Sequence, residues 1–192
     1  RLSFTAIVAR AVAAVLPLHP FLNASLQADS IILWEDVHLG IATSLENGPG
    51  GTLIVPVIRE AQAKSLEQIV SALADLVERA RAKRLAPAEM SGSTFTISNL
   101  GMFGIESFTA IINPPESAIL AVGKIVDTPA STESGSEPRP MMNLTLSADH
   151  RVVDGATAAH FLAGQQPELC GRGAGAGREG KDVQVGGRQG GQ

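Results

Sequence analysis

An α/β fold, with a mixed sheet in a two-layer sandwich, is predicted for this chain of 192 residues. Three observations favour it: helical and strand patterns alternate along the chain, 44% of the residues are hydrophobic, and no internal repeat is present. Charged residues amount to 18%, which together with the hydrophobic share excludes disorder of the whole chain. The length is that of one domain with a core of ordinary size.

The first predicted helix covers residues 2–16, which are apolar around most of the helix circumference, and Pro17 and Pro20 stop it. Runs of apolar and β-branched residues then predict strands at residues 31–34, 39–43 and 52–59. Pro56 removes a hydrogen-bond donor from the last of these runs, which favours an edge or irregular position in the sheet.

The clearest helix is predicted over residues 65–85. Ser65 and Gln68 have the spacing of a capping box, apolar residues follow at helical spacing, and Pro87 ends the segment. Three further strands are expected at residues 92–98, 117–126 and 141–147. The segment DTPASTESGSEPRP before the last strand is expected to be a polar, Pro-rich loop that forms a mobile hairpin excursion.

A last short helix is predicted over residues 154–163, with Asp154 at its N-cap. Ten of the 20 glycines follow, between Gly164 and Gln192. A Gly-rich segment with so few apolar side chains cannot offset its chain entropy by burial. We therefore expect a globular domain over residues 1–163 and a disordered tail, or a stretch of altered reading frame, over 164–192.

Composition excludes several classes of function. The net charge of −4 leaves no basic excess for a nucleic-acid partner, and the single cysteine excludes a disulfide framework or a multi-thiolate zinc site. No apolar run is long enough to span a membrane, and no signal peptide is evident. The chain begins at Arg1, already inside an apolar pattern, so we expect a fragment of an intracellular protein without nucleic-acid or membrane partners.

One histidine stands in a distinctive context, in the segment SADHRVVDG (residues 147–155). A predicted strand delivers His150 to a tight connection, and four residues later Asp154 opens a helix. A metal pair is one interpretation, but no third ligand is evident nearby. A general base is the better one, because an imidazole with a pKa of about 6.5 can take a proton from a thiol or a hydroxyl. For His19, His38 and His160 we expect structural positions.

A second cluster is TFTISNLG (residues 94–101), a strand that ends in Ser-Asn before a glycine-containing loop. Ser98 is open to three interpretations: a turn residue, a hydroxyl that donates to a developing oxyanion, or a nucleophile. The last is disfavoured because no Gly-x-Ser-x-Gly elbow surrounds it. Cys170, in the predicted tail, is not expected to be a nucleophile.

These two clusters, with IINPPESAIL (residues 111–120) between them, make the sequence similar to the catalytic domain of the dihydrolipoamide acyltransferases, the core components of 2-oxo acid dehydrogenase complexes. The resemblance runs from Arg1 to about Ala163. Its motifs are HPFLNASL, LIVPVIR, FTISNLGMFG, IINPPESAILAVG and DHRVVDG.

The resemblance implies the fold of chloramphenicol acetyltransferase, truncated here at its N-terminus, and a homotrimer within a larger core. Each active site would lie between two subunits. It implies that His150 is the general base, that Ser98 stabilises the oxyanion, and that Asp154 is the aspartate of the histidine motif. No cofactor-binding residue and no metal ligand is assigned.

The family's activity would be the transfer of an acetyl group between dihydrolipoamide and coenzyme A, in a complex of the pyruvate dehydrogenase type. Coenzyme A (acetyl-CoA) and lipoamide would be substrates, with the lipoyl group carried on a domain absent from this chain. A decarboxylase and a dihydrolipoamide dehydrogenase would be partners, in the mitochondrial matrix or the bacterial cytoplasm.

Alternatives are a catalytically inert structural core subunit and a succinyl or branched-chain acyltransferase. Inert relatives usually lose the base, whereas His150 is present. An antibiotic-acetylating or condensation enzyme on the same fold is a further alternative, although condensation enzymes prefer a second histidine where this chain has Asp149.

Overall fold

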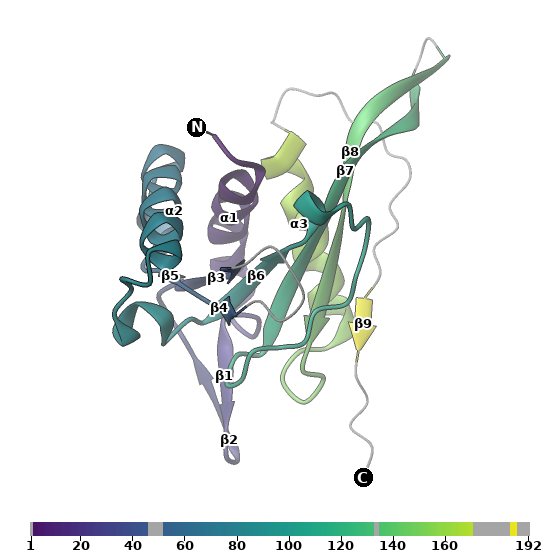
Figure 1. Ribbon diagram of the computed structural model, residues 1–192. Helices are drawn as coiled ribbons and strands as arrows, with labels where there is room; N and C mark the ends of the chain where they lie inside the picture. Colours follow the sequence, from purple (N-terminus) through teal and green to yellow (C-terminus); the bar gives the residue numbers. More distant parts are fainter. Residues whose placement is uncertain (1, 46–51, 133–134, 171–184, 188–192) are drawn as a thin grey trace.

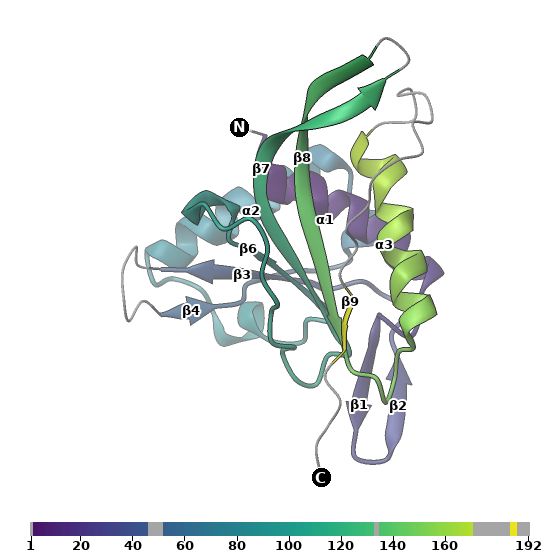
Figure 2. The same cartoon turned by 90° about the vertical axis from the view of Figure 1, so that its right-hand side faces the viewer.

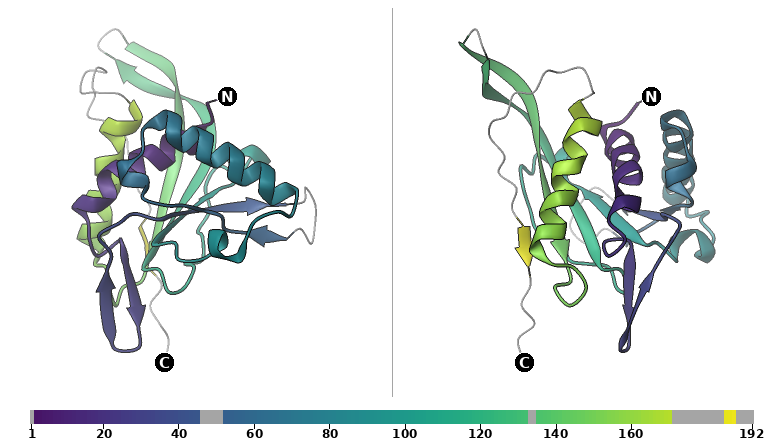
Figure 3. Two further views of the ribbon diagram at one scale, coloured as in Figure 1. Left: turned by 90° about the vertical axis from the view of Figure 1, so that its left-hand side faces the viewer. Right: turned by 180° about the vertical axis from the view of Figure 1, so that it is seen from behind.

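The computed structural model describes residues 2–45, 52–132, 135–170 and 185–187. Three long helices lie side by side on one face of a mixed sheet, with α1 between the other two (Figures 1 and 3). Their bounds are α1 (Phe4–Val15), α2 (Leu66–Arg81) and α3 (Gly155–Cys170). Short 3-10 helices are η1 (Leu16–Leu18), η2 (Ala61–Ala63), η3 (Pro87–Met90) and η4 (Gly101–Phe103). The predicted two-layer α/β arrangement is confirmed.

The main sheet has the strand order β4-β3-β6-β7-β8-β9, and β5 also pairs with β3. Strand β6 is parallel to both of its neighbours, whereas β7 and β8 are antiparallel, so the sheet is mixed as predicted. The strands are β3 (Leu39–Ser44), β4 (Leu53–Ile54), β5 (Val57–Ile58), β6 (Phe95–Asn99), β7 (Ala118–Thr132), β8 (Gly135–Ala148) and β9 (Val185–Gly187). A separate hairpin consists of β1 (Ala24–Gln27) and β2 (Ser30–Leu33).

Two hairpins project from the body of the fold in opposite directions (Figure 2). The longer is the far part of β7 and β8, where pairing continues beyond a register shift at Val122 and Ile125. The hairpin predicted for residues 127–140 is formed, but the described residues of that segment are paired strand and not loop. Each strand there has one free edge, and prolines such as Pro129 and Pro138 are tolerated at edges.

The strand predicted over residues 52–59 is divided into β4 and β5, because Pro56 lies between them. The carbonyl of Pro56 still accepts the Ile41 N–H at 2.9 Å. Strand β1 was not predicted from the sequence, since its four residues carry little apolar pattern.

Helix α3 continues seven residues beyond the predicted end at Ala163, so that boundary lies inside a helix. Its core-facing stripe of Ala158 and Phe161 extends to Gln165, which is 1% exposed, and to Leu169. Residues 171–184 and 188–192 of the predicted disordered tail lie outside the described residues. Within that tail, residues 185–187 form β9, parallel to β8.

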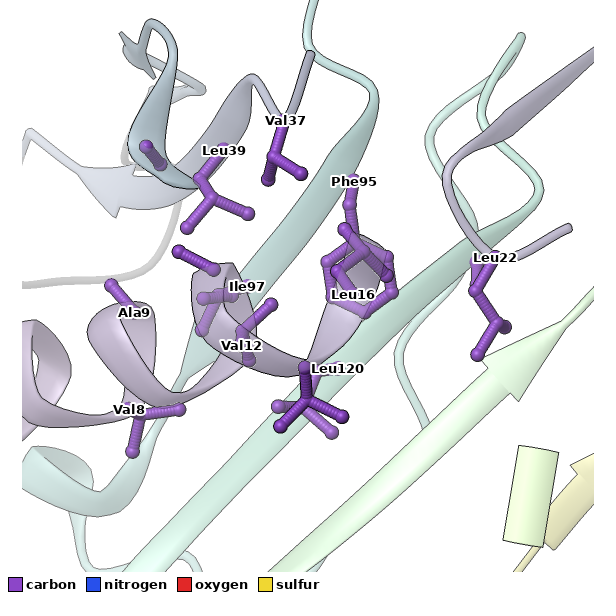
Figure 4. Packing of buried hydrophobic residues seen from close by; sticks show 14 of the residues in the cluster. Val8, Ala9, Val12, Leu16, Leu22, Val37, Leu39, Phe95, Ile97 and Leu120 are labelled. Carbon is purple, nitrogen blue, oxygen red and sulfur yellow. The ribbon is translucent and has the colours of Figure 1, made fainter. Parts of the chain in front are cut away.

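The hydrophobic core fills the space between the helix layer and one face of the sheet (Figure 4). Phe95 and Ile97 of β6 are fully buried there against Val12 of α1 and Leu16 of η1, which are also fully buried. The ring of Phe95 lies 5.6 Å from that of Phe161, which ties β6 to α3. Because side chains alternate along a strand, Thr96, which lies between Phe95 and Ile97, and Ser98, which follows Ile97, face away from the helices.

A segment without regular structure, residues 104–115, connects η4 to β7, and we call it the strap. It starts against the bulge of β7, where the Lys124 N–H donates to the Ile105 carbonyl at 2.7 Å. A Cβ atom added at Gly123 would lie 1.9 Å from the backbone oxygen of Glu106. Only glycine therefore lets the strap come this close to the sheet.

Replacing Gly123 by alanine should lower the free energy of unfolding by about 1–3 kcal/mol or more, because the obstructing atom is backbone and cannot rotate away. The measurement is the denaturant midpoint of unfolding of the full chain. Gly155→Ala is the matched control, since an added Cβ there meets nothing within 4 Å. Equal midpoints for the two variants would contradict the assigned role of Gly123.

Candidate active site

The face of the sheet opposite the helices carries a row of small side chains across four strands. Ala42 of β3 pairs with Ser98 of β6, Ser98 with Ala121 of β7, and Ala121 with Thr145 of β8. Ser98 belongs to this row because Phe95 and Ile97 point from the opposite face of the sheet into the core. The predicted oxyanion donor thus lies half-buried on the face of a strand whose opposite face packs into the core.

Ser98 lines a pocket of about 380 Å³ between this face of the sheet and the strap. Its polar lining includes Thr96, Ser98, Thr109 and Asn113. Its apolar lining includes Leu53, Val55, Phe108, Ile111, Ile112 and Ile119. A mostly apolar pocket with a few convergent polar groups is the usual form of a small-molecule site.

The turn that follows Ser98 is fixed by Asn99. The Asn99 side chain donates to Thr5 Oγ1 at 3.0 Å and accepts the Gly101 N–H at 2.9 Å. Among the described residues, the Ser98 hydroxyl forms no hydrogen bond, so it can donate to a group in the pocket. This leaves the oxyanion interpretation of Ser98 open, and no base among the described residues forms a hydrogen bond with the hydroxyl.

A buried carboxyl group lies beneath the same pocket. Glu116 is 4% exposed, and its Oε1 accepts hydrogen bonds from Ser93 Oγ, from Thr96 Oγ1 at 2.9 Å and from Asn113 Nδ2 at 3.1 Å. Burial raises the pKa of the Glu116 carboxyl, and the three donors oppose that shift. This carboxyl joins β6 to the end of the strap.

The sequence analysis missed this role of Glu116. The available signal was a charged residue directly before the apolar run of a buried strand, a position where charge is rarely tolerated without partners.

His150 follows β8 on a tightly bonded turn. The Asp149 N–H donates to the Ser117 carbonyl at 2.8 Å, and the Asp149 carbonyl accepts from the N–H groups of Val152 and Val153 at 2.9 Å. The Arg151 guanidinium holds the Asp149 carboxylate with contacts as short as 2.6 Å and lowers its pKa. The ring of His150 is exposed, as a proton-transferring group must be before its substrate binds.

Asp154 caps α3, as predicted. Its carboxylate accepts the Thr157 N–H at 2.8 Å and the Thr157 hydroxyl at 3.1 Å. These donors, and to a smaller extent the charge of His150, lower the pKa of Asp154. The carboxylate is therefore used on the helix N-terminus, which fixes where α3 and the preceding turn begin.

Ser98 and His150 of one chain are not brought together. Two strand spacings of about 4.8 Å separate Ser98 from Thr145 in its row, and β8 runs about 10 Å further to Ala148. The bond from Asp149 to Ser117 shows that the chain continues past Ala148, away from the row of Ser98. Within one chain, Ser98 and His150 therefore do not form a single site.

Two of the other histidines, His38 and His19, have structural contacts, as predicted. His38 Nδ1 accepts the Glu60 N–H at 3.1 Å. The ring of His19 packs edge-on against Phe161 at 5.7 Å, and burial, followed by the charge of His160, lowers the pKa of His19.

In the described ranges, no three His, Cys, Asp or Glu side chains gather as a metal site would require. No described helix is both long and apolar enough to cross a membrane.

Comparison with known proteins bears on this arrangement. Residues 1–167 match the family model of the 2-oxoacid dehydrogenases acyltransferase catalytic domain. The chain is 43% identical to an acetyltransferase component of the Bacillus subtilis acetoin cleaving system, over 88% of this chain and 42% of that protein. It is 48% identical to the acetyltransferase component of the mitochondrial pyruvate dehydrogenase complex of Schizosaccharomyces pombe, over 84% of this chain and 33% of that protein.

Solved structures agree with these matches. The cubic core of a pyruvate dehydrogenase multienzyme complex superposes with a TM-score of 0.82 at 40% identity, over 90% of this chain and 70% of that one. The dihydrolipoamide acetyltransferase of Azotobacter vinelandii, studied for the role of a serine, a histidine and an asparagine in its mechanism, gives 0.80 at 40% identity, over 88% and 69%. A chloramphenicol acetyltransferase gives 0.55 at 14% identity, over 87% of this chain and 78% of that one, which shows the shared fold.

The chain spans 42% and 33% of the two curated relatives, and the family model covers most of its length. The fold agrees with these matches, and this chain belongs to the family of 2-oxoacid dehydrogenase acyltransferases, of which it contains catalytic-domain sequence.

Proposed function

We propose that this chain transfers an acetyl group between dihydrolipoamide and coenzyme A in a complex of the pyruvate dehydrogenase type. One observation carries the proposal: Ser98, His150 and Asp154 have the same spacing as the serine, histidine and asparagine named for the Azotobacter vinelandii enzyme. In this chain the serine lies in a pocket and the histidine stands exposed on a fixed turn. Asp154 replaces the asparagine and keeps a side-chain oxygen for the helix cap.

The chemistry requires a base and an oxyanion donor. His150 removes the proton from the thiol of dihydrolipoamide, and the thiolate attacks the carbonyl carbon of acetyl-CoA. Ser98 donates a hydrogen bond to the oxyanion of the tetrahedral intermediate. When the intermediate collapses, the bond to the coenzyme A sulfur breaks and that thiolate takes the proton from His150. The reverse reaction follows the same steps.

The separation of Ser98 from His150 within one chain supports a site shared between two copies. In the homotrimer we propose, Ser98 of one subunit faces His150 of the next. Exposed apolar side chains of the strap and β4, among them Ile111 at 83% and Leu53 at 66% exposure, lie on the pocket side and are suited to burial by a second copy.

An acetyl group is favoured over larger acyl groups because both curated relatives are acetyltransferase components, one acting in acetoin cleavage and one in a pyruvate dehydrogenase complex. A succinyl or branched-chain substrate, or an inert core subunit, has no observation of its own in favour. We propose the decarboxylase and the dihydrolipoamide dehydrogenase of such a complex as partners, and the matrix or bacterial cytoplasm as the place.

Replacing His150 by alanine should lower kcat for acetyl transfer by at least about 10²-fold, because no other described group can take the thiol proton at that position. Rates are measured with acetyl-CoA and dihydrolipoamide. His160→Ala, a neighbouring exposed histidine, is the control and should keep its rate. Near-normal turnover by a folded His150→Ala protein would contradict the general-base role.

Replacing Ser98 by alanine should lower kcat by about 10²–10³-fold with little change in KM, because the hydrogen bond forms only to the transition-state oxyanion. If Ser98 were instead the nucleophile, acetyl-serine would accumulate on mixing the wild-type chain with acetyl-CoA alone. Mass spectrometry of that mixture separates the two roles, and an adduct on Ser98 would overturn direct transfer.

Mixing the Ser98→Ala and His150→Ala proteins should restore part of the activity. Subunit exchange creates interfaces in which an intact Ser98 meets an intact His150. Exchange is verified with differently tagged chains. Absence of recovery despite verified exchange would show that the site is built within one chain.

A further inference from the structure

The orientation of one amide beside Ser98 is determined by the buried carboxyl beneath it. Asn113 Nδ2 donates to Glu116 Oε1 at 3.1 Å. The same oxygen accepts from Ser93 and Thr96, so it acts as an acceptor and must face the NH₂ half of the Asn113 amide. The carbonyl oxygen of that amide, Oδ1, is therefore directed away from Glu116.

Asn113 also lines the pocket that contains Ser98. Its Oδ1 accepts no hydrogen bond from the residues that the structure describes. An acceptor of this kind, held by a buried partner and left free beside a reactive group, is suited to a substrate donor.

We propose that Asn113 Oδ1 accepts a hydrogen bond from an amide N–H of the acyl-carrying arm, and that Glu116 is the positioning residue that orients it. This inference rests on the proposed acetyl transfer, whose two carriers both contain such an amide. Coenzyme A has amides in its pantetheine arm, and dihydrolipoamide ends in one. In either carrier, the group that Asn113 recognises is an amide N–H, which lies several bonds from the sulfur that reacts.

The position of Glu116 makes it suited to this task. It pairs with Ser25 in an isolated β-bridge, its N–H donates to the Asn113 carbonyl at 3.0 Å, and its side chain is buried. Both the backbone and the side chain of Glu116 thus hold Asn113. Glutamine at position 116 would keep an acceptor oxygen for the three donors, whereas alanine would remove it.

The test is steady-state kinetics of the full chain with each thiol substrate varied in turn. Asn113→Ala should raise KM about three- to tenfold for the carrier it binds, with kcat within about twofold, because a hydrogen bond made equally in ground and transition states is lost. Dihydrolipoate, which has a carboxylate in place of the amide, separates the two carriers. If lipoamide is the one bound, Asn113→Ala should remove the preference for dihydrolipoamide over dihydrolipoate.

Glu116→Ala should raise the same KM as Asn113→Ala, Glu116→Gln should restore it, and the double alanine variant should add little to either single one. Asn143→Ala is the matched control, because that amide donates to the Glu106 carbonyl of the strap and does not line the pocket. An unchanged KM for both carriers in Asn113→Ala would overturn the proposal. So would an equal rise in Asn143→Ala, which would indicate loosening of the strap.

Calorimetric titration of the chains with dihydrolipoamide, and separately with coenzyme A, keeps this inference distinct from the proposed function. A wild-type chain that binds a carrier without transferring acetyl would contradict the function. Weaker binding of that carrier by Asn113→Ala would still support the role of Asn113. Equal binding by both chains would contradict it.

Discussion

The fold and the candidate site both depend on the alternation of side chains along β6. Phe95 and Ile97 point into the core, where helices α1 and α3 cover them, and this packing determines the position of the strand. Thr96 and Ser98 must then point to the opposite face. A shift of one residue would bury the serine and expose an aromatic ring, so the hydrophobic core determines the location of the reactive hydroxyl.

The wall of the pocket opposite β6 is a segment without regular secondary structure, which needs fixed points at both ends. At one end the strap lies so close to Gly123 that no side chain fits between them. At the other end the Glu116 carboxyl accepts hydrogen bonds from Asn113 of the strap, from Thr96 of β6 and from Ser93, which precedes β6. A buried carboxyl costs free energy unless its partners compensate, so the three donors are required for the strap to be held there.

The order of the strands keeps Ser98 and His150 of one chain apart. β7 lies between β6 and β8, and His150 follows the end of β8 that pairs with the start of β7. The turn around Asp149 and the cap at Asp154 fix the backbone on both sides of His150. In the shared site proposed above, Ser98 and His150 both stand on fixed segments. Association of two copies is then favoured, because neither segment has to rearrange.

Features formed by residues a few positions apart were determined by the sequence alone. The capping box of Ser65 and Gln68 and the cap at Asp154 are formed as predicted, because each joins groups three residues apart. The motifs around Ser98 and His150 identified the candidate residues in the same way. The end of α3 and the role of Glu116 were decided by the tertiary structure. Each depends on contacts between residues distant in sequence: Leu169 packs against the core, and Glu116 accepts hydrogen bonds from Ser93 and Thr96. A local sequence pattern does not identify such contacts.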